Sequence, residues 1–99
     1  MRTDINVGDI VQHFKRETLS NPGNLYLYKI LAFAEHTETG EMLVIYQALY
    51  KDQSKNINYT IFARPMDMFM SEVEHEKYPN INQKYRFEKY KGEIINEQS

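Results

Sequence analysis

The stretch EHTETGEMLVIYQALY, residues 35–50, carries the clearest structural signal of this 99-residue chain. An acidic turn containing Gly40 separates two apolar segments, and glycine there can take the left-handed conformation that closes a short hairpin. In the segment after the turn, side chains alternate between two faces of a strand. One face consists of Val44, Tyr46, Ala48 and Tyr50. The other consists of Leu43, Ile45, Gln47 and Leu49. We therefore predict a β-hairpin centred on Gly40.

Further strands are predicted on both sides of this hairpin. Its first strand lies in LYLYKILAFAEH, and the others lie in VGDIVQHFK, YTIFARP and KYRFEKY. The segment RETLSNPGN predicts a loop, because proline fixes φ and glycine allows a positive φ. In PMDMFMSEVEH, Pro65 suits a first helical position and predicts one or two helical turns. We expect a mainly β fold, either a small antiparallel SH3-like barrel or a strongly curved sheet, with one short helix.

Composition limits the size and the class of the protein. A chain of this length fits one domain, which we place at residues 1–90, followed by a flexible tail at 91–99. The formal net charge of -2 gives no broad attraction for phosphate backbones. The absence of cysteine excludes disulfides, zinc–thiolate sites and cysteine nucleophiles. The start MRTDINVGDIV lacks the apolar core of a signal peptide, so we expect a cytoplasmic protein that does not enter a membrane.

Polar and aromatic side chains near the strand ends suggest a binding site. Arg64 ends a predicted strand, and its guanidinium can bind a carboxylate or phosphate bidentately. Tyr46 and Tyr50 share a strand face and can stack on a flat ring. Gln47 can join them only if the strand twists or bulges. The predicted ligand-binding residues are His13, Lys15, His36, Tyr46, Gln47, Tyr50 and Arg64. The expected ligand is anionic and carries a ring, such as a nucleotide or a nucleic-acid segment.

A structural interpretation is open for each of these residues. Arg64 can pair with a nearby carboxylate, for which the candidates are Glu38, Asp67 and Glu72. The tyrosines can be core residues with their hydroxyl groups at the rim. His36 can orient the hairpin through hydrogen bonds to the backbone.

Three other functions compete with ligand binding. The edge strand YRFEKYKGE and the methionine-rich stretch PMDMFM suit a protein-interaction module or a homodimer. A metal-assisted hydrolase would need three or four convergent ligands, and the residues around His36 match no metal-binding spacing. A nucleophilic enzyme would need a base and a third orienting group beside Thr37 or Thr39, which lie in a turn. We therefore predict no catalytic residue, no metal and no cofactor.

Four separated motifs resemble the signature of the bacterial and phage family called domain of unknown function 1653. They are HFK at 13–15, HTET at 36–39, VIYQALY at 44–50 and ARPMDMF at 63–69. The resemblance covers about residues 7–75, and the segment KYPNINQKYRFE is similar to longer members. This chain has Arg16 and the segment ETLSNPGN where many relatives have glycine, and Phe62-Ala63 where they often have Trp-Val. The resemblance implies a small bacterial or phage domain and no particular activity.

Overall fold

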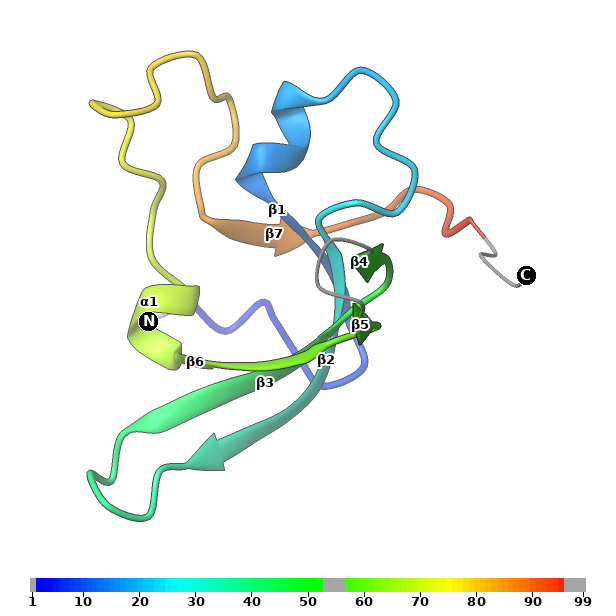
Figure 1. Ribbon diagram of the computed structural model, residues 1–99. Coiled ribbons are helices and arrows are strands. Elements are labelled where there is room, and N and C mark those ends of the chain that lie inside the picture. Colours follow the sequence, from blue (N-terminus) through cyan, green and yellow to red (C-terminus); the bar gives the residue numbers. More distant parts are fainter. Residues whose placement is uncertain (1, 53–56, 96–99) are drawn as a thin grey trace.

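The computed structural model describes residues 2–52 and 57–95 and contains a five-stranded antiparallel sheet (Figure 1). Its strand order is β6-β3-β2-β1-β7. The strands are β1 (Ile10–His13), β2 (Leu27–Glu35), β3 (Met42–Ala48), β6 (Ile61–Pro65) and β7 (Phe87–Lys89). A separate two-stranded ribbon pairs β4 (Lys51–Asp52) with β5 (Ile57–Asn58). The helical elements are the 3-10 turn η1 (Phe14–Thr18) and the single-turn helix α1 (Met66–Phe69). The predicted class, mainly β with one short helix, is confirmed.

The hairpin of β2 and β3 follows the predicted alternation. Gly40 has a φ of 75°, and its N–H donates to the carbonyl of His36 at 2.8 Å, which closes the turn. Val44, Tyr46 and Ala48 are buried, while the opposite face of β3 is partly exposed. The alternation therefore gives β3 one face toward the core and one face away from it.

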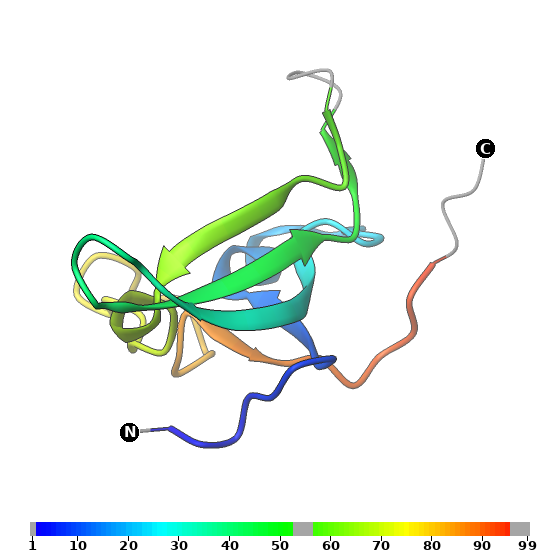
Figure 2. The same ribbon diagram turned by 90° about the horizontal axis from the view of Figure 1, so that it is seen from below.

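The sheet is strongly curved and open. The register between β2 and β3 shifts by one residue between Ile30 and Ala32, which leaves Leu31 as a bulge that bends β2. In a flat sheet β3 and β7 would lie about 14 Å apart, because three strand spacings of roughly 4.8 Å separate them. The rings of Tyr46 on β3 and Phe87 on β7 nevertheless have centroids 5.5 Å apart. In Figure 2, β1 and β7 turn away from the plane of β3 and β6.

No hydrogen-bonded ladder joins the edge strands β6 and β7 within the residues described. Of the two predicted architectures, the curved sheet is therefore the one observed, and the closed barrel is not. The short helix α1 lies at the end of β6, where its Phe69 is fully buried. The rings of Phe69 and Phe87 stack with centroids 4.0 Å apart, so α1 covers one end of the curved sheet.

The first strand is shorter than predicted. The sequence suggested a strand through Lys15, but β1 ends at His13 and the chain enters η1 with Phe14 buried. The imidazole Nδ1 of His13 accepts a hydrogen bond from the backbone N–H of Lys15 at 3.1 Å, which caps the turn. Lys15 therefore lies in η1 and does not share a strand face with His13, but the two residues remain neighbours.

Hydrogen bonds between side chains and the backbone hold the loop before β2 and the C-terminal segment. Nη1 of Arg16 donates to the carbonyls of Gly23 and Leu25, both at 2.8 Å, and so fastens the loop that the sequence places in ETLSNPGN. The amide of Asn24 bonds both the N–H and the carbonyl of Ile95, at 2.9 and 2.6 Å. The last part of the predicted tail, residues 96–99, lies outside the described residues. Among the residues described, no helix is long and apolar enough to span a membrane.

Candidate ligand-binding site

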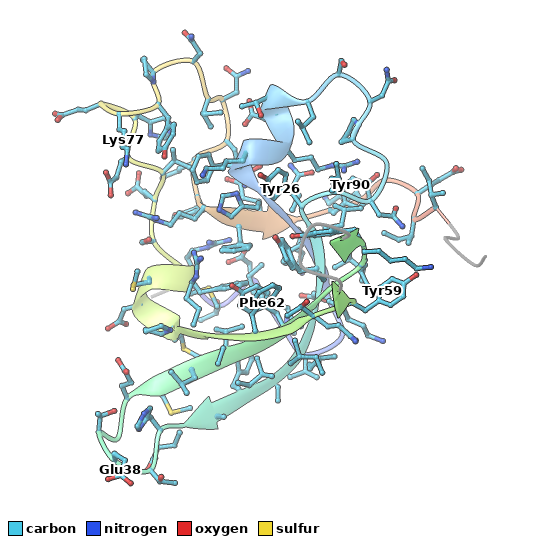
Figure 3. The ribbon with its side chains drawn as sticks, viewed as in Figure 1. Tyr26, Glu38, Tyr59, Phe62, Lys77 and Tyr90 are labelled. Carbon is cyan, nitrogen blue, oxygen red and sulfur yellow. The ribbon has the colours of Figure 1, made fainter. Side chains whose placement is uncertain are left out.

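A cavity of about 200 Å³ opens on the inner, concave side of the curved sheet. Every strand of the five-stranded sheet contributes to its lining, and so do η1 and the loop before β2. The lining residues are His13, Lys15, Tyr26, Tyr28, Tyr46, Phe62, Arg64 and Phe87. Figure 3 shows Phe62 on β6 and Tyr26 on the far side of the same inner space. Five aromatic rings, one imidazole and two cationic side chains thus meet at one place.

The aromatic wall is a packed network of rings. The ring of Tyr46 has its centroid 5.2 Å from that of Tyr28 and 5.5 Å from that of Phe62. The hydroxyl groups of Tyr28 and Tyr50 are 2.9 Å apart and share a hydrogen bond. Burial raises the pKa of Tyr28, and the hydrogen bond with Tyr50 adds to the increase. Both rings and hydroxyl groups are therefore fixed in place, and the phenol of Tyr28 stays protonated at neutral pH.

Tyr26 belongs to this wall through an unusual backbone conformation. Its φ is 63°, in the left-handed region that disfavours side chains with a Cβ atom. The ring of Tyr26 stacks on His13 with centroids 5.6 Å apart. The N–H of His13 donates to the carbonyl of Tyr26 at 2.9 Å, which holds this backbone in place. Strained residues of this kind concentrate at functional sites, and this one lies in the cavity wall.

His13 is a neutral member of the site at physiological pH. Burial first, and then the positive charges of Arg64 and Lys15, lower the pKa of His13 to about 4. Its Nδ1 accepts the N–H of Lys15, so the ring proton of the neutral imidazole lies on Nε2. The ring also stacks on Phe14 with centroids 4.4 Å apart. His13 can therefore offer one N–H donor in a fixed orientation.

Arg64 is half-buried on β6, with its guanidinium carbon 5.4 Å from the centroid of the Phe87 ring. The sequence left open an ion pair with Glu38, Asp67 or Glu72. Among the described parts of the chain, the ion pairs are Arg2–Asp4, Arg86–Glu74 and Lys89–Asp9, so no carboxylate there neutralises Arg64. Burial raises the pKa of Tyr46 while the charge of Arg64 opposes that increase, which places the two side chains close together.

A second cavity of about 180 Å³ adjoins the first and shares three of its lining residues with it. Its lining consists of His13, Phe14, Lys15, Arg64, Glu74, Lys77, Tyr78 and Arg86. Four cationic side chains and one carboxylate face this space. Nη2 of Arg86 lies 3.0 Å from Oε1 of Glu74. The sign of the local charge is thus opposite to the formal net charge of the whole chain.

The α1–β7 loop, residues 70–86, supplies the outer wall of this second cavity. Two sets of hydrogen bonds hold the loop against η1 and β1. The carboxylate of Glu17 accepts the backbone N–H groups of Asn82 and Gln83, at 2.9 and 2.7 Å. The buried amide of Gln83 bonds the side chain and the carbonyl of Gln12, at 3.0 and 3.1 Å. The packing of Phe14 on Tyr78, with ring centroids 5.0 Å apart, adds an apolar contact.

The structure brings together four of the seven predicted binding residues: His13, Lys15, Tyr46 and Arg64. Tyr50 does not line the cavity but adjoins two residues that do, since its ring packs edge-on against Tyr28 and Tyr26 with centroids 5.7 and 6.4 Å apart.

Two predicted residues lie elsewhere. Gln47 is on the opposite face of β3, where its amide donates to the carbonyl of Tyr59 at 3.1 Å. His36 lies in the hairpin turn, near the labelled Glu38 in Figure 3, and its Nδ1 accepts the N–H groups of Glu38 and Thr39. That contact is the hairpin-orienting role left open from the sequence.

Nine residues that line the two cavities were not among the predicted site residues, and six of them show why. Tyr28 and Phe62 lie on inward faces of their strands. Counting register outward from the turn at Gly40 would have placed Tyr28 on the outer face, because the bulge at Leu31 shifts the pairing of β2 by one residue. Phe62 pairs directly with Tyr46, but it lies on β6, outside the predicted hairpin. Phe87 and Tyr26 become wall residues only through the curvature of the sheet and the left-handed backbone. No local sequence pattern predicts that Arg86 and Lys77 lie at the site, because their position depends on the hydrogen bonds that hold the α1–β7 loop against η1 and β1.

In two larger cavities, the arginine side chains are already engaged in contacts within the protein. The one of about 610 Å³ next to α1 is lined in part by Arg2, which bonds Asp4 at 3.1 Å and packs over the Tyr85 ring at 3.8 Å. The one of about 650 Å³ contains Arg16, which bonds two backbone carbonyls. Within the described parts of the chain, no group of three or more His, Cys, Asp and Glu side chains could hold a metal ion.

Comparison with known proteins gives a family assignment. No curated protein and no solved structure matches the chain. A family model does match, and its match extends from the start of β1 to the end of β7, which includes all the strands that line the cavity. The chain therefore belongs to the family described as Protein of unknown function (DUF1653), whose model matches residues 9–89.

Proposed function

We propose that this protein is a non-catalytic binding module that recognises an anionic ligand carrying a flat ring, such as a nucleotide or a nucleic-acid segment. The observation that carries the proposal is the cavity in which an aromatic wall meets the cations of Lys15 and Arg64. A base stacked on an aromatic side chain contributes roughly 1 to 3 kcal/mol. A guanidinium adds a bidentate contact to a phosphate or a carboxylate.

The charge of the cavity supports an anion over a cation. An aromatic cage alone would also suit a quaternary ammonium group. Lys15 and Arg64 repel such a group, and no acidic side chain lines the aromatic cavity among the described residues. The neutral imidazole of His13 and the tyrosine hydroxyl groups can then recognise the ring through hydrogen bonds.

The contacts of His13 favour binding over acid–base chemistry. Its pKa of about 4 leaves it neutral, and its Nδ1 is engaged by the backbone of η1. A proton accepted at Nδ1 would break the hydrogen bond that caps this turn. His13 thus serves best as a fixed donor in the wall.

A thermal-shift screen tests the proposal. The purified protein is heated with mononucleotides, dinucleotides, cyclic nucleotides and short oligonucleotides, because a ligand at a hundred times its Kd stabilises by about 2.7 kcal/mol. We expect at least one of them to raise the melting temperature of the wild type. Arg64→Ala should abolish that shift without lowering the melting temperature of the free protein, and Tyr46→Phe should weaken the shift. No response across the panel, or an unchanged response in Arg64→Ala, would contradict the proposal.

A second candidate function is a protein-interaction module or a homodimer that uses the edge strand β7 and the methionine-rich stretch. It is favoured by the position of β7 at the end of the sheet and by Met68, whose side chain is 52% exposed. Phe69 is buried and cannot face a partner. Light scattering over a concentration series tests the homodimer: a dimer lost in Met68→Asp but kept in Arg64→Ala would support it, and a monomer at every concentration would refute it.

A further inference from the structure

The two adjoining cavities differ in chemistry. The first is mainly aromatic, while the second is surrounded by cationic groups. Lys15, Arg64 and His13 line both, so a ring in the first cavity can send a substituent into the second without leaving the protein surface. Small-molecule sites commonly have volumes of about 300–1,000 Å³. Neither cavity reaches that range by itself, and the two together do.

The cations of the second cavity outnumber the acceptors there. Lys15, Arg64, Lys77 and Arg86 face it, against the single carboxylate of Glu74. In Figure 3, Lys77 lies on the loop that follows α1. The aromatic rings beneath two of these cations, Phe87 under Arg64 and Tyr78 under Lys77, support the charges without neutralising them. An anion that enters this space therefore meets several donors at once.

Arg86 is partly buried, unlike the exposed Lys15 and Lys77. Its side chain is only 25% exposed, whereas that of its partner Glu74 is 61% exposed. The Nε–H of Arg86 is buried and has no hydrogen-bond acceptor among the described residues. Buried guanidinium groups normally have their donors satisfied. The buried Nε–H adds to the cost of holding this charge, so an anion in the cavity that binds the accessible end of the guanidinium offsets part of that cost.

We propose that the second cavity binds the terminal phosphate of a nucleotide whose base lies against the aromatic wall of the first. This inference rests on the proposed function and names the ligand class more closely, as a phosphate monoester. A monoester carries close to two negative charges at neutral pH, and an internal phosphodiester carries one. A cavity with three more cations than carboxylates is the better complement for the dianion. The α1–β7 loop also supplies half of the residues that line this cavity, among them Lys77 and Arg86.

Glu74 already holds the guanidinium of Arg86 that a phosphate would bind. Its carboxylate already bonds Arg86 at 3.0 Å, and its exposure lets it swing into solvent when a phosphate arrives. The carboxylate therefore competes with the ligand for the same guanidinium. Removing its charge should tighten phosphate binding, which is the opposite of the effect expected when a neighbouring cation is removed.

Isothermal titration calorimetry tests the inference with the common nucleosides and their 5′-monophosphates. In the wild type, we expect a monophosphate to bind about tenfold tighter than its own nucleoside, because the phosphate adds contacts to the cations of the second cavity. This ratio corresponds to about 1.4 kcal/mol. Arg86→Gln and Lys77→Gln should reduce that ratio and leave the affinity for the nucleoside unchanged. Glu74→Gln should increase the affinity for the monophosphate by about threefold, the effect of one partly exposed charge.

Two controls make the result specific. Lys89→Gln removes a cation of β7 that pairs with Asp9 outside both cavities, so it should leave the ratio unchanged. Lys77 is exposed, so its variant remains informative if Arg86→Gln proves unstable. Oligonucleotides with a 5′-phosphate or a 5′-hydroxyl group then separate a free nucleotide from the end of a strand as the source of the phosphate.

The outcomes separate this inference from the proposed function. Nucleosides and monophosphates that bind equally well, with no effect of Arg86→Gln, would overturn the phosphate site and leave the ring site intact. An oligonucleotide without a terminal phosphate that binds as tightly as its phosphorylated form would also overturn it. If neither nucleosides nor monophosphates bind, the phosphate site is overturned. The proposed function is overturned as well if dinucleotides, cyclic nucleotides and oligonucleotides also fail to bind.

Discussion

Replacing His13 with asparagine should remove a specific part of the pH dependence of folding. In the folded protein, burial and the nearby cations hold the pKa of His13 at about 4, against an ordinary value of 6.5. Between these two values the unfolded chain binds a proton that the folded protein does not. The contribution of His13 to stability is therefore complete above pH 6.5, decreases as the pH falls, and is lost near pH 4.

The size of this effect follows from the difference between the two pKa values. At 1.36 kcal/mol for each pKa unit, the fall from 6.5 to about 4 sets a ceiling of about 3 kcal/mol. His13 is partly exposed, and solvent screening reduces the expected value to about 1 to 2 kcal/mol. Asparagine retains an oxygen that can accept the N–H of Lys15, so His13→Asn removes the titration while keeping the cap of η1.

Urea denaturation at a series of pH values from 8 to 4 measures the free energy of unfolding of both proteins. Subtracting the variant from the wild type cancels the titration of the carboxylates that the two proteins share. The advantage of the wild type over the variant should shrink by about 1 to 2 kcal/mol as the pH falls from 6.5 to 4. Parallel curves across this range would refute the burial of a neutral imidazole at this position.

Two further substitutions test the local geometry. Glu17→Gln leaves one good acceptor for the two N–H groups of Asn82 and Gln83, so urea denaturation should show a free energy of unfolding lower by about 1 to 2 kcal/mol. An unchanged value would mean that these two hydrogen bonds contribute little to stability. Gly40→Ala meets no atom within 4 Å but forces alanine into a φ of 75°, so it should cost about 1 kcal/mol. Equal stability of wild type and Gly40→Ala would show that the turn relaxes to another conformation.

The sequence predicts the parts of this protein that depend on near neighbours. The alternation in residues 42–50 and the glycine of the turn are local signals, and they place Tyr46 on the buried face correctly. Whether Tyr46 approaches Phe87 depends on the bulge at Leu31 and on the curvature of five strands, which no short pattern encodes.

The candidate site shows the same limit. His36 and Gln47 look suitable by residue type, but the turn and the strand face direct them away from the cavity. Arg86 reaches the site because Gln83 bonds Gln12, and these two residues lie 71 positions apart in the chain. Contacts at such separations follow from the packing of the whole domain, so composition and spacing alone could not reveal the second cationic cavity.

The position of Phe87 also has a consequence for the order of folding. Its ring packs on α1 and closes the aromatic wall formed by β2 and β3, and it enters the chain only after most of the sequence. Until β7 joins β1, the inward rings of the earlier strands have no cover on that side. Contacts between distant residues form slowly, because a long loop must close first. A nascent or truncated chain that lacks β7 therefore exposes a hydrophobic aromatic surface. The rings that shape the cavity thus make incomplete chains prone to aggregation.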